Sequence, residues 1–139
     1  MKKGQIFARC AVVAIAGILQ PLPAAAECFS WPVESVYDGD TLRATVGGQS
    51  TRIRIMGLDT PELPPHNKCA SEKELGYAAR DRLRALLEGA EVAFCPDGRD
   101  RYGRTLAVVL VDGRDVADVL IGEGLAREYN GGRRQGWCS

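Results

Sequence analysis

Apolar and polar residues alternate over two stretches in the first half of the chain, residues 42–46 and 51–56. A period of two is typical of strands that bury one face of a sheet. Gly47-Gly48, between the two stretches, is a hairpin turn signal. Together with a further stretch over 33–37, the pattern predicts three successive strands.

The period becomes helical after an irregular, proline-rich loop over 61–67. Apolar residues then recur three and four positions apart up to Leu87, and Gly89 is placed to end a helix. Ser71 and Glu74 have the spacing of a capping box, which predicts that the helix begins near Ser71.

Two more strands and a short helix complete the pattern. Residues 91–95 and 105–111 are predicted strands, and Asp115 is placed to cap a helix over 116–123. The order of three strands, a helix, two strands and a helix suits a mainly β fold with two helices. That fold is the five-stranded, partly open Greek-key barrel known as the OB-fold.

The first 26 residues have the layout of a cleavable signal peptide. Lys2, Lys3 and Arg9 precede a short apolar run over 10–19, and Ala24-Ala25-Ala26 stand before Glu27. The apolar run is too short to span a bilayer. We therefore expect a signal peptide over 1–26, one domain over 27–139, and export to the periplasm or the medium without stable membrane association.

The charge of the expected domain excludes a broad basic surface for nucleic acid. The full chain has no net charge, and the expected signal peptide removes three basic residues and no acidic one, so the domain carries −3. Binding of a nucleic acid would then need local positive charge or a metal ion.

Four cysteines follow the expected signal peptide: Cys28, Cys69, Cys95 and Cys138. An even number in an exported chain predicts two disulfides, and four cysteines allow three pairings. A zinc site is the alternative, but the chain has no C-x-x-C pair and His66 is its only histidine.

Carboxylates follow two of the predicted strands. Asp38-Gly39 is a favoured turn pair, but Asp40 adds a carboxylate that the turn does not require. Asp40 and Asp59, with the backbone carbonyl of Thr60, provide the oxygen ligands that calcium or magnesium prefers. Glu62 is then left to act on a water molecule as a base.

Two arginines complete this set. Arg54 stands five positions before Asp59, and Arg104 ends the segment 100–104, whereas Arg52 is assigned to the solvated face of its strand. Arginine is suited to paired contacts with phosphate. Ligands for a cation, arginines for a phosphate and a spare carboxylate for water are what phosphodiester hydrolysis needs.

Three segments, D-G-D-T at 38–41, R-I-M-G-L-D-T-P-E at 54–62 and D-R-Y-G-R at 100–104, resemble the staphylococcal nuclease (thermonuclease) family in order and spacing. The resemblance extends from about Val33 to Arg127. It implies an OB-fold barrel and calcium-dependent hydrolysis of DNA and RNA that leaves 3′-phosphate ends.

The resemblance also implies roles for individual residues. The implied calcium ligands are Asp40, Asp59 and Thr60, the implied catalytic residues are Arg54, Glu62 and Arg104, and the implied substrate contacts are Arg101, Tyr102 and Tyr129. Two features depart from the family. Its reference nuclease has a third, C-terminal helix, for which this chain shows no pattern. Its base pocket uses two tyrosines where this chain has only Tyr129, and Trp137 is a candidate for part of that surface.

The barrel of this family further implies how the cysteines pair. Its first strand runs antiparallel beside its fourth, which brings Cys28 close to Cys95. The tail after Tyr129 is expected to return past the loop that contains Cys69. We therefore expect the disulfides Cys28–Cys95 and Cys69–Cys138.

The expected function is that of an exported, monomeric, calcium-dependent endonuclease acting on DNA and RNA. The alternative is a non-catalytic OB-fold module that binds single-stranded nucleic acid. Such a module would need aromatic stacking platforms and a basic groove, whereas this domain has few aromatic residues and is acidic.

Overall fold

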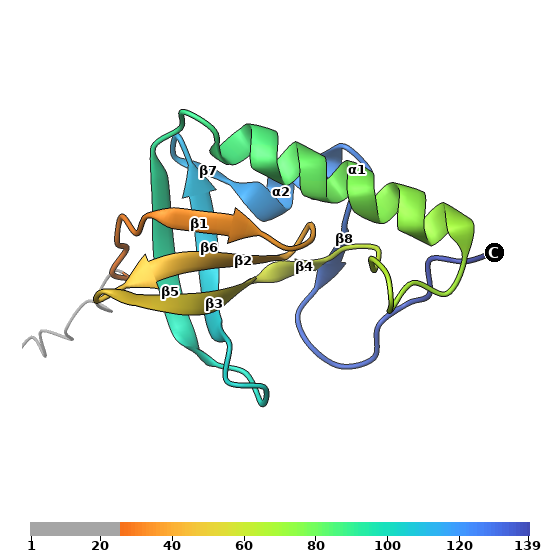
Figure 1. Ribbon diagram of the computed structural model, residues 1–139, viewed down its shortest axis with the longest axis horizontal. Helices are drawn as coiled ribbons and strands as arrows, with labels where there is room; N and C mark the ends of the chain where they lie inside the picture. Colours follow the sequence, from red (N-terminus) through yellow and green to blue (C-terminus); the bar gives the residue numbers. More distant parts are fainter. Residues whose placement is uncertain (1–25) are drawn as a thin grey trace, which may run out of the picture.

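The computed structural model describes residues 26–139, so the expected signal peptide lies outside the described residues except for Ala26 (Figure 1). The elements in chain order are β1 (Val33–Val36), β2 (Thr41–Val46), β3 (Gln49–Ile55), β4 (Gly57–Asp59), α1 (Ala70–Leu87), β5 (Val92–Arg99), β6 (Thr105–Val111), β7 (Arg114–Asp115), α2 (Val116–Gly122) and β8 (Arg127–Tyr129). No helix within 26–139 is long and apolar enough to cross a membrane.

Six strands form the main sheet, in the order β1-β2-β3-β6-β5 with β7 paired to β6. All neighbouring pairs are antiparallel except β3 and β6, which run parallel. Figure 1 shows β1, β2 and β3 crossing in front of β5 and β6, with α1 above them. The expected fold class is confirmed: a mainly β OB-fold with two helices, in which the chain after α2 forms only β8.

The alternating residues of β2 and β3 face the core as the pattern predicted. Leu42, Ile53 and Ile55 are fully buried, and they pack with Phe94 of β5 and Leu83 of α1 in one apolar cluster. Burial of such side chains contributes about 1.5–3 kcal/mol each. This cluster joins β2 and β3 to β5 and α1.

The segment before β1 meets β5, at the other edge of the sheet, at a single point. Phe29 exchanges two backbone hydrogen bonds with Phe94, at 2.7 and 2.8 Å, and the Trp31 ring stacks between these two aromatic rings. The expectation that the first strand runs beside the fourth was wrong for β1 itself, which pairs only with β2. The pairing with β2 continues to Pro32, whose carbonyl accepts a bond from the Thr45 backbone at 2.9 Å, and only the segment before it reaches β5, at Phe29.

The Cys28–Cys95 disulfide lies directly beside this junction, and Cys69–Cys138 joins the start of α1 to the tail. Both expected pairings are confirmed. The first bridge ties down the segment before β1, which has only one pair of ladder bonds to β5. The second brings a distant part of the chain against the loop after β4.

The predicted capping box at the start of α1 is wrong. The helix begins at Ala70 with Cys69 as its N-cap residue, and no side chain caps it. Glu72, at the third helical position, instead accepts a hydrogen bond from the Lys68 backbone at 2.6 Å. The helix thus begins before Ser71, and Glu72, three residues after the N-cap residue, stands where Glu74 was expected relative to Ser71.

A second, two-stranded sheet was not predicted. Strand β4 pairs with β8, so that Asp59 lies opposite Arg127 and Gly57 lies opposite Tyr129. Figure 1 shows the blue tail leaving β8 and looping back to the start of α1. This pairing brings the last residues of the chain to the loop that contains Glu62.

Replacing both Cys28 and Cys95 with serine should lower the free energy of unfolding by up to about 4 kcal/mol. The bridge closes a loop between residues 67 positions apart, and its loss increases the entropy of the unfolded chain. Urea unfolding with Cys69–Cys138 intact measures the change. An unchanged midpoint would show that the Phe29–Phe94 junction holds the sheet edges without the bridge.

Candidate active site

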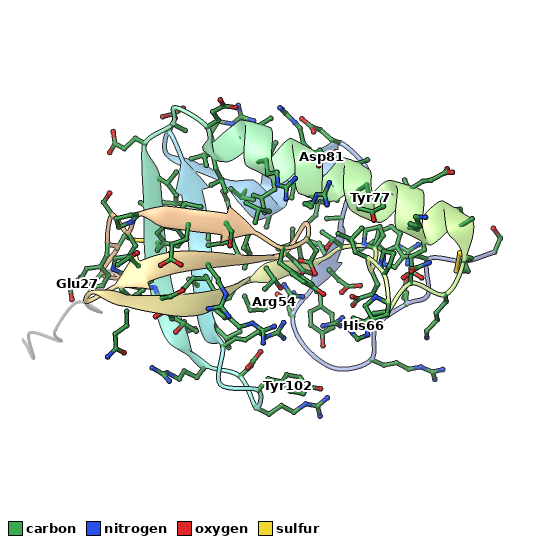
Figure 2. All side chains as sticks on the ribbon, in the orientation of Figure 1. Glu27, Arg54, His66, Tyr77, Asp81 and Tyr102 are labelled. Carbon is green, nitrogen blue, oxygen red and sulfur yellow. A yellow bond between two sulfur atoms is a disulfide. The ribbon has the colours of Figure 1, made fainter. Side chains whose placement is uncertain are left out.

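One open cavity, of about 760 Å³, collects most of the predicted site residues. Its walls include residues from the β1–β2 turn, the loop after β4, the β5–β6 loop and the tail. Among them are Asp38, Asp40, Asp59, Thr60, Glu62, Tyr102, Arg104, Arg134 and Trp137. Figure 2 labels Arg54, His66 and Tyr102 around this region, between the end of β3, the loop before α1 and the β5–β6 loop.

The β1–β2 turn positions Asp40. Asp38 accepts a hydrogen bond from the Asp40 backbone at 3.0 Å, and Asp40 accepts bonds from the Thr41 hydroxyl at 3.0 Å and the Thr60 backbone at 3.2 Å. Asp38 is itself buried. Its interpretation as a simple turn residue is therefore incomplete, because it places a further buried carboxylate beside Asp40.

Close packing at two glycines brings these segments together. A Cβ on Gly39 would lie 2.7 Å from the Thr60 methyl and 2.8 Å from Ala79. A Cβ on Gly76 would lie 3.1 Å from the backbone oxygens of Pro61 and Glu62. Only glycine fits such approaches without a shift, so these two positions set how near the turn, the loop and α1 can lie.

Arg54 lies among the carboxylates and not on the cavity wall. Its guanidinium is 3.2 Å from Asp40 and 4.0 Å from Asp59, and it donates to the Leu58 carbonyl at 2.9 Å. Its side chain is 6% exposed. The guanidinium is thus engaged by the protein, whereas Arg52, which is exposed as predicted, lines the cavity.

Asp59 offers the least satisfied oxygen of the site. Its Oδ1 is buried and has no hydrogen-bond partner among the described residues, although Arg134 Nε lies 3.4 Å away. Its Oδ2 accepts a bond from the Trp137 indole at 3.4 Å. A buried carboxylate oxygen without a donor is costly unless a cation or water satisfies it.

Glu62 lies across the cavity on the loop before α1. Its backbone N–H donates to the buried Glu72 carboxylate at 3.3 Å. Its own Oε1 accepts a bond from Arg134 Nη1 at 2.8 Å. The Glu62 carboxylate is partly exposed and is placed to meet water.

Burial and mutual repulsion change the protonation of this cluster. Burial, followed by the nearby Asp40 charge, raises the pKa of Asp38 to about 7. Burial also raises the pKa of Asp59 and Glu62, with Asp40 adding to the effect and Arg134 opposing it. The raised pKa values show that the arginines of the site compensate only part of the negative charge of these buried carboxylates.

Arg104 faces the carboxylates from the β5–β6 loop. Asp100 accepts a bond from Arg104 Nε at 2.7 Å, and the Tyr102 ring lies 5.5 Å from the Arg104 guanidinium. Because Asp100 engages Nε, the two terminal nitrogens are left for another partner. Arg104 and Tyr102 both line the cavity, whereas Arg101 bonds the Tyr102 hydroxyl at 2.8 Å and lies outside its wall.

Tyr129 lies beside this cavity and not in it. It lines a neighbouring hollow of about 360 Å³ that shares Asp59 and Arg134 with the main one. Its hydroxyl donates to the Gly132 carbonyl at 2.9 Å. Trp137, the sequence candidate for part of the base surface, does line the main cavity.

Two contributors to the site were missed from the sequence, Arg134 and Glu72. Arg134 belongs to a Gly- and Arg-rich tail without periodicity, and Glu72 reads as an ordinary helix residue. The sequence offered one signal for Arg134. This residue lies four residues before Cys138, and the expected bridge to Cys69 carries this part of the tail to the loop after β4. The cluster of Cys69, Glu72 and Cys138 is no metal centre, because both sulfurs are in a disulfide.

Comparison with known proteins places this arrangement in a family. The family described as "Staphylococcal nuclease homologue" matches residues 52–136, more than half of the chain. SPbeta prophage-derived endonuclease YokF of Bacillus subtilis is 37% identical over 98 residues, 68% of this chain and 32% of that protein. Endonuclease YncB of the same organism is 36% identical over 98 residues, 68% of this chain and 46% of that protein.

A further relative is the thermonuclease of Staphylococcus intermedius, 34% identical over 105 residues, 70% of this chain and 58% of that protein. The chain thus spans between about a third and somewhat over half of the length of these relatives. The matched region contains the end of β3 from residue 52, the loop with Asp59 and Glu62, and the β5–β6 loop with Arg104. On the family match and these identities, the chain belongs to the staphylococcal nuclease homologue family.

Proposed function

We propose that this protein is a calcium-dependent phosphodiester hydrolase that cuts DNA and RNA and leaves 3′-phosphate ends. The observation that carries the proposal is the buried, unpartnered Asp59 Oδ1 in a group of carboxylates that faces Arg104 across one cavity. The nuclease names of its relatives support the reaction class. The product ends and the use of calcium follow from the family resemblance.

The donor set fits a hard cation. Asp40 and Asp59 present carboxylate oxygens at one end of the cavity, and Thr60 is buried beside them. His66 is the only histidine, and the four cysteines within 26–139 are in disulfides, so oxygen ligands dominate. Calcium held by Asp40, Asp59 and the Thr60 carbonyl would supply positive charge beside a non-bridging phosphate oxygen.

Glu62 acts on the attacking water. Its carboxylate lines the cavity, and burial keeps its pKa above the ordinary value, which favours acceptance of a proton near neutral pH. The water oxygen bonds to phosphorus as its proton passes to Glu62, and the bond from phosphorus to the 5′ oxygen breaks. The departing 5′ oxygen takes a proton from solvent. The Glu72 carboxylate, by accepting the Glu62 backbone N–H, holds the loop in place.

The arginines stabilise the negative charge that grows on the phosphoryl oxygens. Arg104 presents its terminal nitrogens to the cavity, in the fork geometry that suits phosphate. Arg54 contributes its positive charge from behind the cavity wall, because its guanidinium is bonded to backbone carbonyls and lies 3.2 Å from Asp40. Tyr102, 66% exposed beside Arg104, offers a stacking surface for a base, with Arg101 and Tyr129 as flanking contacts.

Two disulfides indicate an oxidising compartment. We propose export by the signal peptide over 1–26 and action as a monomer over 27–139, in the periplasm or the medium. The test is the cellular fraction in which the protein is found, together with the N-terminal residue of the isolated form.

Excess chelator should abolish cleavage of single-stranded DNA, and added calcium should restore it. Asp59→Asn should lower turnover at least 10²-fold, because it removes a charged ligand. Asp118→Asn, on the exposed face of α2, is the control and should cleave like the wild type. Binding of DNA without cleavage in any metal would instead support the OB-fold binding module.

Glu62→Gln should reduce kcat by about 10²–10⁴-fold, because the amide cannot accept the proton. Arg104→Lys should lose about 10²–10³-fold, since an ammonium lacks the paired donors. Arg114→Lys, on the exposed strand β7, is the matched control. Steady-state cleavage at saturating calcium measures all three, and a fully active Glu62→Gln enzyme would remove Glu62 from the proposed chemistry.

Asp38→Asn should stabilise the metal-free protein at pH 8 by more than about 1.4 kcal/mol, the equivalent of one pKa unit. Between about pH 4 and pH 7 folded Asp38 keeps a proton that the unfolded chain has released, so stability falls as pH rises through this window. Asparagine keeps the acceptor for the Asp40 backbone and removes the charge. Urea unfolding at pH 8 and pH 4 provides the measurement, and an equal gain at both values would contradict this cause.

A further inference from the structure

The tail of residues 130–138 is fixed at both ends against the site. At its start, β8 pairs with β4, and Arg127 lies opposite Asp59. At its end, Cys138 is bonded to Cys69, the residue before α1. A segment rich in glycine, which would otherwise sample many conformations, is thereby confined to a short path past the cavity.

Further contacts hold the tail between these anchors. The Arg127 guanidinium lies 3.8 Å from the centre of the Trp137 ring and donates to the Gly136 carbonyl at 2.7 Å. The Trp137 indole donates to Asp59 Oδ2 at 3.4 Å. These contacts determine where Arg134, four positions before Cys138, can reach.

Arg134 reaches the carboxylate that is proposed to act on water. Its Nη1 donates to Glu62 Oε1 at 2.8 Å, and its guanidinium lies 5.6 Å from the centre of the Tyr129 ring. Within 26–139 no protein donor bonds the other Glu62 oxygen, Oε2. The carboxylate is therefore held by one oxygen and has the second available to a water molecule.

We propose that Arg134 is a positioning residue that orients the Glu62 carboxylate, and that the Cys69–Cys138 bridge holds it there. The inference rests on the proposed hydrolytic function. The Glu62 side chain is 34% exposed and sits on a loop, so without a fixed partner its carboxylate would rotate among several orientations. A misplacement of about 1 Å in a reacting group can cost roughly 10²-fold in rate.

The same contact could have the opposite role, in which Arg134 blocks the proposed cation site. Arg134 Nε is 3.4 Å from Asp59 Oδ1, so the guanidinium could compete with a cation for that oxygen. The shorter bond, however, is to Glu62, and Trp137 also reaches Asp59 without carrying a charge. The two roles predict opposite effects of removing the side chain.

Arg134→Ala should lower kcat on single-stranded DNA by about 10- to 100-fold at saturating calcium, with KM changed less than about threefold. Arg134→Lys should have an intermediate kcat, because a lysine ammonium can bond Glu62 but cannot contact Asp59 at the same time, as the guanidinium does. Arg133→Ala, the neighbouring exposed arginine with no bond to Glu62, is the control and should match the wild type. Calcium titration calorimetry provides a readout independent of activity and should show the Kd of Arg134→Ala within about threefold of the wild type.

Coupling to Glu62 is tested in a Glu62→Gln background. If Arg134 acts through Glu62, adding Arg134→Ala to that variant should change kcat by less than about threefold. Serine at both Cys69 and Cys138 should reduce kcat toward the Arg134→Ala value. Serine at both Cys28 and Cys95, assayed below its melting temperature, should leave kcat unchanged.

Several results would overturn the inference. Wild-type or higher activity of Arg134→Ala, tighter calcium binding by that variant, a loss confined to KM, or full additivity with Glu62→Gln would each do so. Full activity of the folded Cys69→Ser/Cys138→Ser protein would remove the role of the bridge. If cleavage requires Glu62 but not Arg134, only this inference is wrong. If the wild type does not cleave DNA, the proposed function is wrong and the inference falls with it.

Discussion

Repulsion among Asp38, Asp40 and Asp59 is the constraint that the rest of the structure has to accommodate. All three carboxylates are buried, with Arg54 3.2 Å from Asp40 and Arg134 3.4 Å from Asp59. Backbone N–H groups of Asp40 and Thr60 satisfy two of the acceptors, but Asp59 Oδ1 is left without a donor. Such an arrangement is unfavourable for the protein alone and would become favourable on binding of the proposed cation, so stability and the proposed function oppose each other here.

The fold supplies the force that holds these groups together. Apolar residues of β2, β3 and α1 form one core, and the chain leaves that core at the points where the carboxylates stand. Gly39 and Gly76 then allow the turn, the loop and the helix to approach more closely than any side chain would permit. The packing of the core and of these two glycines therefore positions the turn and the loop that bear the carboxylates.

Much of this arrangement was predictable from local patterns. Period-two alternation identified β2 and β3, β6 was predicted over its exact range, Asp115 caps α2 as expected, and the motif residues Asp40, Asp59, Glu62 and Arg104 line one cavity. The β4–β8 pairing, the buried Glu72 and the reach of Arg134 were not predictable, because each depends on contacts between residues distant in the sequence. Arg54 shows the same limit: strand alternation identified its face, but not that protein carbonyls would engage its guanidinium.

The two disulfides interlock along the chain, since Cys28 pairs with Cys95 and Cys69 pairs with Cys138. Cys138 follows every strand and helix in the order of synthesis. A growing chain can therefore close its sheet through Cys28–Cys95 while Cys69 still awaits its partner. The segment bearing Arg134 and Trp137 would be the last to emerge in a chain that folds from its N-terminus, so such a chain would carry a folded scaffold beneath an incomplete cavity wall.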